Sequence, residues 1–276
     1  MSLNNFIPTI WSARLYQTLK NAHVFANVVN RDYEGEISSY GDSVKINSIG
    51  SITVGDYAKN GTINLQQLNS AQSTLEITEA KYFNFMVDDI DKAQNNPKVM
   101  DGAMQEAGFA LADTADSFLA AFQSDAGSTV TQAQLDTNPE ESYDALADAA
   151  LALDENNVPR EGRFAVVPPF FNKAMVLAGI FETLSGTISA EQEKMNGYVG
   201  QLLGFDIWVS NNLETDGGAT VGIAGTRKAI SYAEQILDME AYRPENRFAD
   251  AVKGLHVYGG KVIYPNALVR LVVTAG

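Results

Sequence analysis

The chain has 276 residues, of which 45% are hydrophobic, so it can bury a substantial core in one discontinuous domain or in two lobes. It contains no cysteine and two histidines, which excludes disulfides, thiolate metal sites and cysteine nucleophiles, and leaves a histidine metal site only with carboxylate partners. The formal net charge is −15, and residues 101–160 carry most of it with Arg160 as their one base, which argues against nucleic-acid binding through a basic patch.

The amino-terminal region predicts a short amphipathic helix followed by an arm. Pro8 suits a first helical turn, and apolar residues recur around it at helical spacing, namely Ile7, Trp11, Leu15 and Leu19. The next apolar residues precede charged and turn-forming ones and predict an extended arm rather than a packed helix: Val24, Phe25, Val28 and Val29. The apolar side of this arm needs a partner.

Residues 36–87 are rich in β-branched residues and glycine and predict a long hairpin. Asn60-Gly61 favours a tight turn at its tip, because both central positions of a type I′ turn need positive φ. Near its end, one side of a single strand carries the apolar residues Leu75, Ile77, Phe83, Phe85 and Val87. A ribbon of about 50 residues is marginally stable alone, so we expect it to dock onto a neighbouring copy of the chain.

The remainder predicts a long helix and then an α/β alternation. Asn96-Pro97 starts a helix that reaches about Gln123, and a second helix begins after Asn138 and ends near Asn157. A buried strand at 164–167 precedes a helix from Pro169 to Phe181, and residues 182–196 are expected to form a mobile loop. The following segments predict short strands, and two long strands are expected after Phe248.

Signatures of catalysis are absent from the sequence. It contains no GxxxxGK[ST], HExxH or GxSxG motif, and the glycines of GGATVGIAG lack dinucleotide-binding spacing, so we expect no enzyme, although an unrelated serine, histidine and aspartate constellation stays open. No segment approaches the roughly 18 apolar residues of a membrane span, and no signal peptide is evident, so we expect synthesis and folding in the cytosol without membrane contact.

Some polar residues admit two interpretations. The carboxylates Asp88-Asp89-Asp91 and Glu140-Glu141 could bind calcium, but both groups lie where helix starts are expected, so the prediction is no metal and no cofactor. We interpret His23 and His256 as surface or half-buried residues. Trp11 and Trp208 lie in apolar patterns that favour a core or an interface.

Four stretches of the chain together resemble a known family. They are FIPTIWSARLYQTLKNAHVFANVVNRDYEGEISSYGDSVKI near the amino terminus, VVPPFFN at 166–172, GFDIWVSNN at 204–212 and the ending RFADAVKGLHVYGGKVIYPNALVRLVV. In order and spacing the chain resembles the major capsid (coat) proteins of tailed bacteriophages, which have the Hong Kong 97-like fold. The resemblance implies an α+β fold with an N-terminal arm, an extended β-hairpin loop, a peripheral domain with a long spine helix, and an axial α/β domain.

The resemblance also implies domain boundaries. Residues 1–34 would form the N-terminal arm and 35–87 the extended loop. The peripheral domain would comprise 88–137, with the spine helix, and the closing strands at 236–276, while 138–235 would form the axial domain around fivefold and sixfold positions.

By the same resemblance, the chain would be a structural protein of the virion that assembles with itself into pentamers and hexamers of an icosahedral head. Its further partners would be a separate scaffolding protein, a portal, and double-stranded DNA enclosed without sequence-specific binding. The residues expected to serve assembly are Lys59, Asn60 and Gly61 at the loop tip, with Trp11 and Leu15 in the arm. Some relatives cross-link lysine to asparagine, but Lys59, Asn246 and Asn266 do not align with that chemistry, and we interpret them as exposed polar residues.

Three alternatives remain open from the sequence. An encapsulin-type compartment would share the fold but enclose cargo enzymes, although no encapsulin-like amino-terminal sequence is present. A surface-layer or tail-tube protein would share the cysteine-free, acidic composition. A soluble hydrolase with an unrecognised site would form a small oligomer with a pocket.

Overall fold

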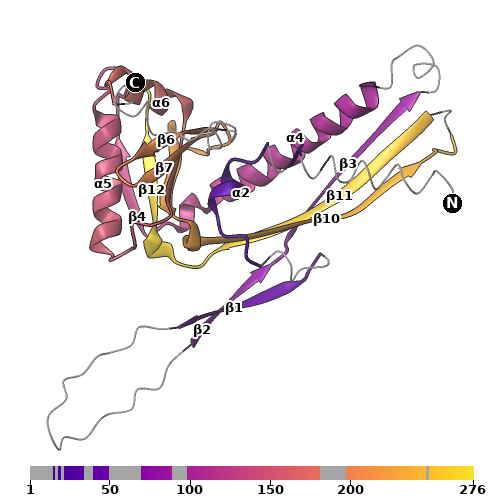
Figure 1. Ribbon diagram of the computed structural model, residues 1–276, viewed down its shortest axis with the longest axis horizontal. Helices are drawn as coiled ribbons and strands as arrows, with labels where there is room; N and C mark the ends of the chain where they lie inside the picture. The colour runs from indigo at the N-terminus through magenta and orange to yellow at the C-terminus, as the bar shows by residue number, and fades with distance from the viewer. Residues whose placement is uncertain are drawn as a thin grey trace, which may run out of the picture.

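The computed structural model describes residues 15, 18, 19, 22–33, 40–49, 70–88, 98–180, 197–246 and 249–276. The strands of these residues form a two-stranded, a three-stranded and a seven-stranded sheet. The seven-stranded sheet and two helices make an α/β lobe, and the long strands of the three-stranded sheet extend from this lobe beside the long helix α4 (Figure 1). Among the described residues, no helix has the length and apolar content needed to cross a bilayer.

The predicted hairpin is confirmed in the described part of residues 36–87. Strand β1 (Ser43–Ile49) pairs antiparallel with β2 (Ser70–Glu76), in a register that sets Ser43 opposite Glu76 and Ile49 opposite Ser70. The two strands form a sheet of their own. The predicted turn at Asn60-Gly61 lies outside the described residues.

The single strand predicted through Leu75 and Val87 is instead two strands in different sheets. β2 ends at Glu76, Ile77 and Thr78 break the strand, and β3 (Glu79–Asp88) joins the three-stranded sheet at the edge of β11. The order of that sheet is β10 (Ile230–Tyr242), β11 (Ala249–Val262), β3, and all pairs are antiparallel. The apolar alternation of Leu75 and Ile77 is interrupted at Glu79 and Lys81, directly after the break, and this interruption was the local signal of the change of sheet.

The predicted long helix is confirmed as α4 (Lys98–Ala120), which continues into the 3₁₀ helix η3 (Ala121–Asp125). Its proposed start at Asn96-Pro97 lies outside the described residues. The buried face of α4 follows helical spacing and consists of Met104, Gly108, Leu111, Ala112, Ala115, Asp116, Leu119 and Ala120. Asp116 interrupts this apolar stripe with a charge, so it requires partners in the core.

The α/β lobe contains the helices α5 (Glu141–Glu155) and α6 (Pro169–Leu177), close to the predicted bounds. Its strands are β4 (Ser128–Gln132), β5 (Arg163–Val167), β6 (Tyr198–Leu202), β7 (Phe205–Val209), β8 (Thr215–Asp216), β9 (Ala219–Thr226) and β12 (Leu268–Val273). Sheet order along the main path is β4-β12-β9-β5-β7-β6, and β8 pairs with β9. Short 3₁₀ helices, η5 (Arg227–Ala229) and η6 (Pro265–Ala267), precede β10 and β12. The expected mobile loop at 182–196 lies outside the described residues.

Strand β5 is buried on both faces of the sheet, and this explains its continuous apolar sequence. Ala165 and Val167 belong to the core under α5 and α6, with Phe171 and Leu146 among the largest members. Phe164 and Val166 belong to the opposite core, which the sheet shares with the carboxyl end of α4, the amino-terminal segment and strands β10 and β11. The lobe and the long elements are therefore joined through one continuous hydrophobic cluster.

The sheet topology divides the chain differently from the predicted boundaries at two places. Strand β4 falls in 88–137 and β12 in 236–276, both predicted as peripheral, yet both lie in the seven-stranded sheet of the lobe. Val269 of β12 is opposite Ser128 of β4 in a parallel pair, and β12 is antiparallel to β9. The apolar strand β12 completes this sheet because η6 turns the chain back toward β9 after β11. The other domain boundaries stay predictions.

Candidate assembly site

The hairpin is rooted on its own chain by a small apolar cluster. Val44 and Ile46 of β1 and Leu75 of β2 pack with Ile77 against Ala233 of β10 and Val257 of β11. The root is also fixed by backbone hydrogen bonds, from Gly41 N to Ile77 O at 3.2 Å and from Ile77 N to Asp42 O at 3.0 Å. These contacts hold the base of the hairpin at a fixed place.

The crossing of the hairpin root over β11 depends on Gly259. A Cβ atom at this position would lie 2.2 Å from the carbonyl oxygen of Glu76 and 2.9 Å from Cα of Ile77, both in the backbone of the root. No side chain fits in that space, so glycine permits the close approach of the two backbones. Beyond the root, β1 and β2 lead away from the long strands and the lobe (Figure 1).

The amino-terminal segment packs on α4 inside the same chain. Leu15, Leu19 and Ala22 have helical backbone and form an apolar cluster with Met104, Leu111, Ala112 and Val252. Gly108 of α4 allows this contact, because a Cβ there would lie 3.0 Å from Cγ2 of Thr18 and 3.5 Å from Cδ1 of Leu15. Leu15, predicted to serve assembly, is thus fully buried in its own subunit.

The stretch predicted as an extended arm contains a short packed helix instead, α2 (Phe25–Val28). Phe25, Ala26 and Val28 are fully buried in the cluster that the lobe shares with α4. After α2 the chain runs beside β10, where Asn30 forms a parallel bridge with Ser231. The partner that the apolar side of this segment needs is therefore its own chain.

A charged cluster fixes the segment at its polar positions. His23 Nδ1 lies 3.1 Å from Asp116 Oδ1 of α4, and His23 Nε2 lies 3.1 Å from Glu234 Oε2 of β10. Asp116 also accepts the backbone N–H of Val24 at 2.7 Å. Arg31 forms an ion pair with the other oxygen of Glu234. The cluster thus joins the amino-terminal segment, α4 and β10.

Glu234 is the centre of this cluster. Its Oε2 atom accepts the Tyr232 hydroxyl at 2.9 Å and faces His256 Nε2 at 3.1 Å as well as His23. Both histidines are fully buried, which corrects the prediction that they are surface or half-buried residues. Polar groups are buried here because carboxylates on α4 and β10 supply acceptors for them.

Burial and charge shift the pKa values of these groups. Burial by itself lowers the pKa of His23, but hydrogen bonds to Asp116 and Glu234, with their negative charges, outweigh it and raise that pKa from 6.5 to about 9. Burial acts to raise the pKa of Glu234, whereas hydrogen bonds from His23 and His256 and the charges of His23 and Arg31 hold it well below 4.5. His23 is therefore a cation and Glu234 an anion at neutral pH.

The cluster contains histidines and carboxylates, but its geometry is that of a structural network. Both ring nitrogens of His23 and the Nε2 atom of His256 face carboxylate oxygens, and among the described residues no group of His, Cys, Asp or Glu is arranged to hold a metal ion. Glu140 and Glu141 lie at the start of α5, as the helix-start interpretation expects, whereas Asp88 is the last residue of strand β3, which corrects that interpretation for Asp88. Asp89 and Asp91 lie outside the described residues.

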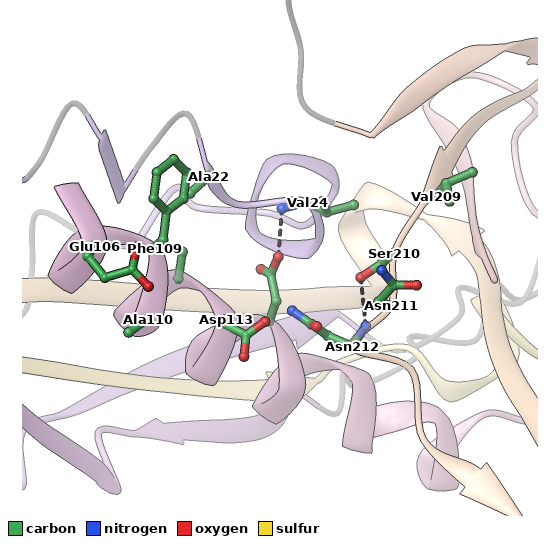
Figure 2. Close-up of a pocket in the computed structure, with 12 residues that line it drawn as sticks. Ala22, Val24, Glu106, Phe109, Ala110, Asp113, Val209, Ser210, Asn211 and Asn212 are labelled. Atoms are coloured by element: carbon green, nitrogen blue, oxygen red, sulfur yellow. Dashed lines mark hydrogen bonds between the residues drawn. The ribbon is translucent and has the colours of Figure 1, made fainter. Parts of the chain in front are cut away.

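A groove of about 510 Å³ lies beside the cluster (Figure 2). Glu106, Phe109 and Asp113 of α4 form one wall, and Asn211 and Asn212, which follow β7, form the other. Its charged side chains are acidic, since Asp116 also lines it. The groove therefore disfavours anionic ligands such as phosphates.

Strand β3, the last strand of the three-stranded sheet among the described residues, has exposed apolar side chains. Tyr82 of β3 is 78% exposed and Met86 is 47% exposed. Between them, Asn84 donates to the Tyr242 hydroxyl at 3.0 Å across the face of the sheet. Exposed tyrosine and methionine are typical of surfaces that contact other protein chains.

Of the five predicted assembly residues, Leu15 is buried against α4 in its own chain. The other four lie outside the described residues, namely Trp11, Lys59, Asn60 and Gly61. Asn246 and Asn266 are exposed, as expected of solvated polar residues. Sequence reasoning missed the charged cluster. The available signals were Asp116 on the apolar stripe of α4, and each histidine directly beside buried apolar residues.

A long helix beside long antiparallel strands, a rooted hairpin and an α/β lobe define the Hong Kong 97-like coat fold. A family model described as phage capsid protein matches residues 72–271. A chain from the solved structure described as Mycobacterium phage Che8 is 33% identical, with a TM-score of 0.71 over 90% of this chain and 90% of that one. No curated protein sequence matches the chain.

More distant structures share the fold. The capsid of the cyanophage P-SCSP1u is 18% identical, with a TM-score of 0.69 over 93% of this chain and 90% of that one. A virus-like particle from Pyrococcus furiosus is 14% identical, with a TM-score of 0.59 over 94% and 96%. The chain belongs to the phage capsid protein family. It is a structural major capsid protein, a virion component that assembles with itself into a shell.

Proposed function

We propose that copies of this chain form pentamers and hexamers through the lobe and close into an icosahedral head around double-stranded DNA. The hairpin of each copy lies on a neighbouring copy and ties the capsomers together. A separate scaffolding protein directs curvature, a portal occupies one vertex, and assembly takes place in the host cytoplasm. Many modest contacts of this kind allow errors to be corrected while the closed shell is collectively stable.

The observation that carries this proposal is the isolation of the hairpin sheet. Among the described strands β1 and β2 pair only with each other, so within that part of the chain each has one edge without a strand partner. A two-stranded sheet is marginally stable in water, and exposed edges favour pairing or docking. The root is held by its own chain, so the ribbon leaves the subunit in a fixed direction, and this supports docking onto a neighbour.

Charge supports enclosure of DNA without specific binding. The net charge of −15 and the acidic groove beside α4 oppose contact with phosphates. A chain of this charge confines DNA inside the shell rather than binding it through its own surface.

A structural rather than catalytic role fits the buried histidines and Glu234. His23 and His256 are 0% exposed and Glu234 is 7% exposed, so these groups present no reactive atom to a substrate. Their side chains hydrogen-bond to one another and to the side chains of Asp116, Arg31 and Tyr232. We therefore assign them to folding.

The encapsulin alternative shares the fold, as the match to the Pyrococcus furiosus particle illustrates, so fold alone does not separate it. The family model and the 33% identity to the Mycobacterium phage Che8 chain favour the phage head. The content of purified particles separates the two: a phage head protein gives empty or DNA-filled shells, whereas a compartment protein gives shells with a cargo enzyme.

A shortened hairpin tests the proposal. Ile49 and Ser70 are paired, so residues 50–69 can be replaced by Asn-Gly, which closes a two-residue turn in the same register. The full chain and the variant are each expressed with the scaffolding protein from the same phage and examined by size exclusion and negative-stain microscopy. We expect shells from the full chain and unassembled subunits or capsomers from the variant, with an unchanged thermal unfolding midpoint as the folding control. Shells of normal yield from the folded variant would overturn the proposal.

A further inference from the structure

The two ring nitrogens of His23 both face carboxylate oxygens, Asp116 Oδ1 on one side and Glu234 Oε2 on the other, each at 3.1 Å. Ionised carboxylates only accept hydrogen bonds, so both nitrogens must carry a proton for both bonds to exist. A neutral imidazole has one N–H and would turn a lone pair toward the second carboxylate. The bridge between α4 and β10 therefore requires the imidazolium form.

We propose that His23 is an alkaline-sensitive latch, whose cationic ring holds residues 22–31 against α4 and β10 and whose deprotonation lets this segment open while the lobe stays folded. The latch is a property of the single subunit. It goes beyond the proposed function and does not depend on assembly.

The groups around His23 explain why this residue is the one that loses its proton as the pH rises. Asp116 faces it from α4 and Glu234 faces it from β10. Glu234 in turn faces Tyr232 on its own strand, His256 on β11 and Arg31 on the amino-terminal segment. The ring of Tyr258, also on β11, contacts the His256 ring with a centroid distance of 5.1 Å. Arginine keeps its charge and the pKa of Tyr232 lies well above 10.0, so neither loses its proton before His23 does.

The sign of the pH dependence follows from the folded pKa of about 9 and the usual value of 6.5 in the open segment. A raised pKa gives stability that is fully present below 6.5 and is lost as pH rises through about 9. Between these values the opening constant increases about tenfold per pH unit, because the open segment loses the proton first.

Opening is confined to the segment because the second core does not include it. The cluster under α5 and α6 contains Ala165 and Phe171 but none of residues 22–31. The cluster on the other face of the sheet does contain Val24 to Val29. Deprotonation of His23 therefore acts on one core and leaves the other closed.

The first test is direct titration of the histidine. The chain has two histidines, so selective ¹⁵N-histidine labelling gives two ring systems, and His23→Gln assigns them. We expect the His23 ring of the wild-type chain to show two protonated nitrogens at pH 8 and to titrate near 9. A neutral ring at pH 8 overturns the latch. The titration itself uses the wild-type chain, and a folded variant is needed only to assign the two histidine signals.

The second test measures the opening of the segment through the reactivity of an introduced thiol. The chain has no cysteine, so each variant carries a single thiol. Ala26→Cys places a thiol in the fully buried segment, Ala165→Cys places one in the second core, and Ser124→Cys places one on the surface. The labelling rate of each buried thiol with a maleimide is divided by that of the exposed thiol, which removes the effect of pH on the thiol.

From pH 7 to 9, we expect the corrected rate for Ala26→Cys to rise about fortyfold, because His23 is half deprotonated in the closed form at pH 9, and that for Ala165→Cys to stay constant. Adding His23→Gln to Ala26→Cys removes the dependence, because glutamine does not titrate. A constant rate for Ala26→Cys, a parallel rise for Ala165→Cys, or an unchanged dependence with His23→Gln would each overturn the proposal.

Discussion

His23 Nε2 lies 3.1 Å from Glu234 Oε2, across 211 positions of sequence. The contact ties a residue of the amino-terminal segment to the strand at the edge of the three-stranded sheet. Because the same ring also contacts Asp116, the segment is part of the subunit core rather than a free arm. The stability of the subunit should therefore depend on both carboxylates.

Glu234→Gln should lower the free energy of unfolding by about 3–5 kcal/mol at pH 7, since it removes the anion that pairs with two buried or half-buried cations. Urea denaturation measures the change. The matched control is Glu240→Gln on the same strand, whose exposed ion pair with Lys253 should contribute about 1 kcal/mol or less. Equal effects for the two variants would show that Glu234 is not central to the cluster.

The effect of Glu234→Gln should diminish in acid. The pKa of Glu234 is depressed in the folded chain, so its stabilisation is present above the usual value of 4.5 and is lost as pH falls through the lower folded value. Urea denaturation of the wild-type chain and the variant at a series of acidic pH values should show converging unfolding free energies below 4.5. A difference that stays constant down to the acid unfolding of both chains would contradict this assignment.

Gly259→Ala should destabilise the subunit by about 1–3 kcal/mol, because its Cβ would force the hairpin root away from β11. Gly102 of α4 serves as the control, since nothing lies within 4 Å of a Cβ there. Gly102→Ala should stabilise by about 0.5–1 kcal/mol through helix propensity. Thermal and urea unfolding would reveal the opposite signs, and a neutral Gly259→Ala would mean that the root is not closely packed.

Phe171→Ala should cost about 3–5 kcal/mol, because this fully buried side chain fills the core under α5 and α6. Phe109→Ala, on the 52% exposed side chain that lines the groove, should cost about 1 kcal/mol at most. Urea denaturation of both variants compares the two aromatic sites. Similar losses would indicate that the groove wall is part of the core.

Local periodicity was sufficient to predict α4, α5 and α6, because each helix has an apolar face and a recognisable start. The change of sheet at Ile77-Thr78 was missed because strand-forming residues continue on both sides of it, although Glu79 and Lys81 interrupt the apolar alternation where the hydrogen-bond partners change. The packing of α2 was missed because four residues carry too little periodicity to distinguish a helix from an extended arm.

The charged cluster could not be predicted for a different reason. His23, Asp116 and Glu234 are far apart in sequence, and although local signals mark single members of the cluster, nothing in the sequence shows which of them pair with one another. The resemblance to phage coat proteins covered nearly the whole chain and correctly gave the fold and family, but it carried no information about pairs of buried side chains.

Cryo-electron microscopy of particles assembled from the full chain with its scaffolding protein tests the central claim most directly. The account predicts closed icosahedral shells in which the β1–β2 ribbon of each subunit lies on an adjacent subunit, while residues 22–31 remain on their own α4 and β10. Tubes or flat lattices, or shells in which every ribbon folds back on its own subunit, would contradict it.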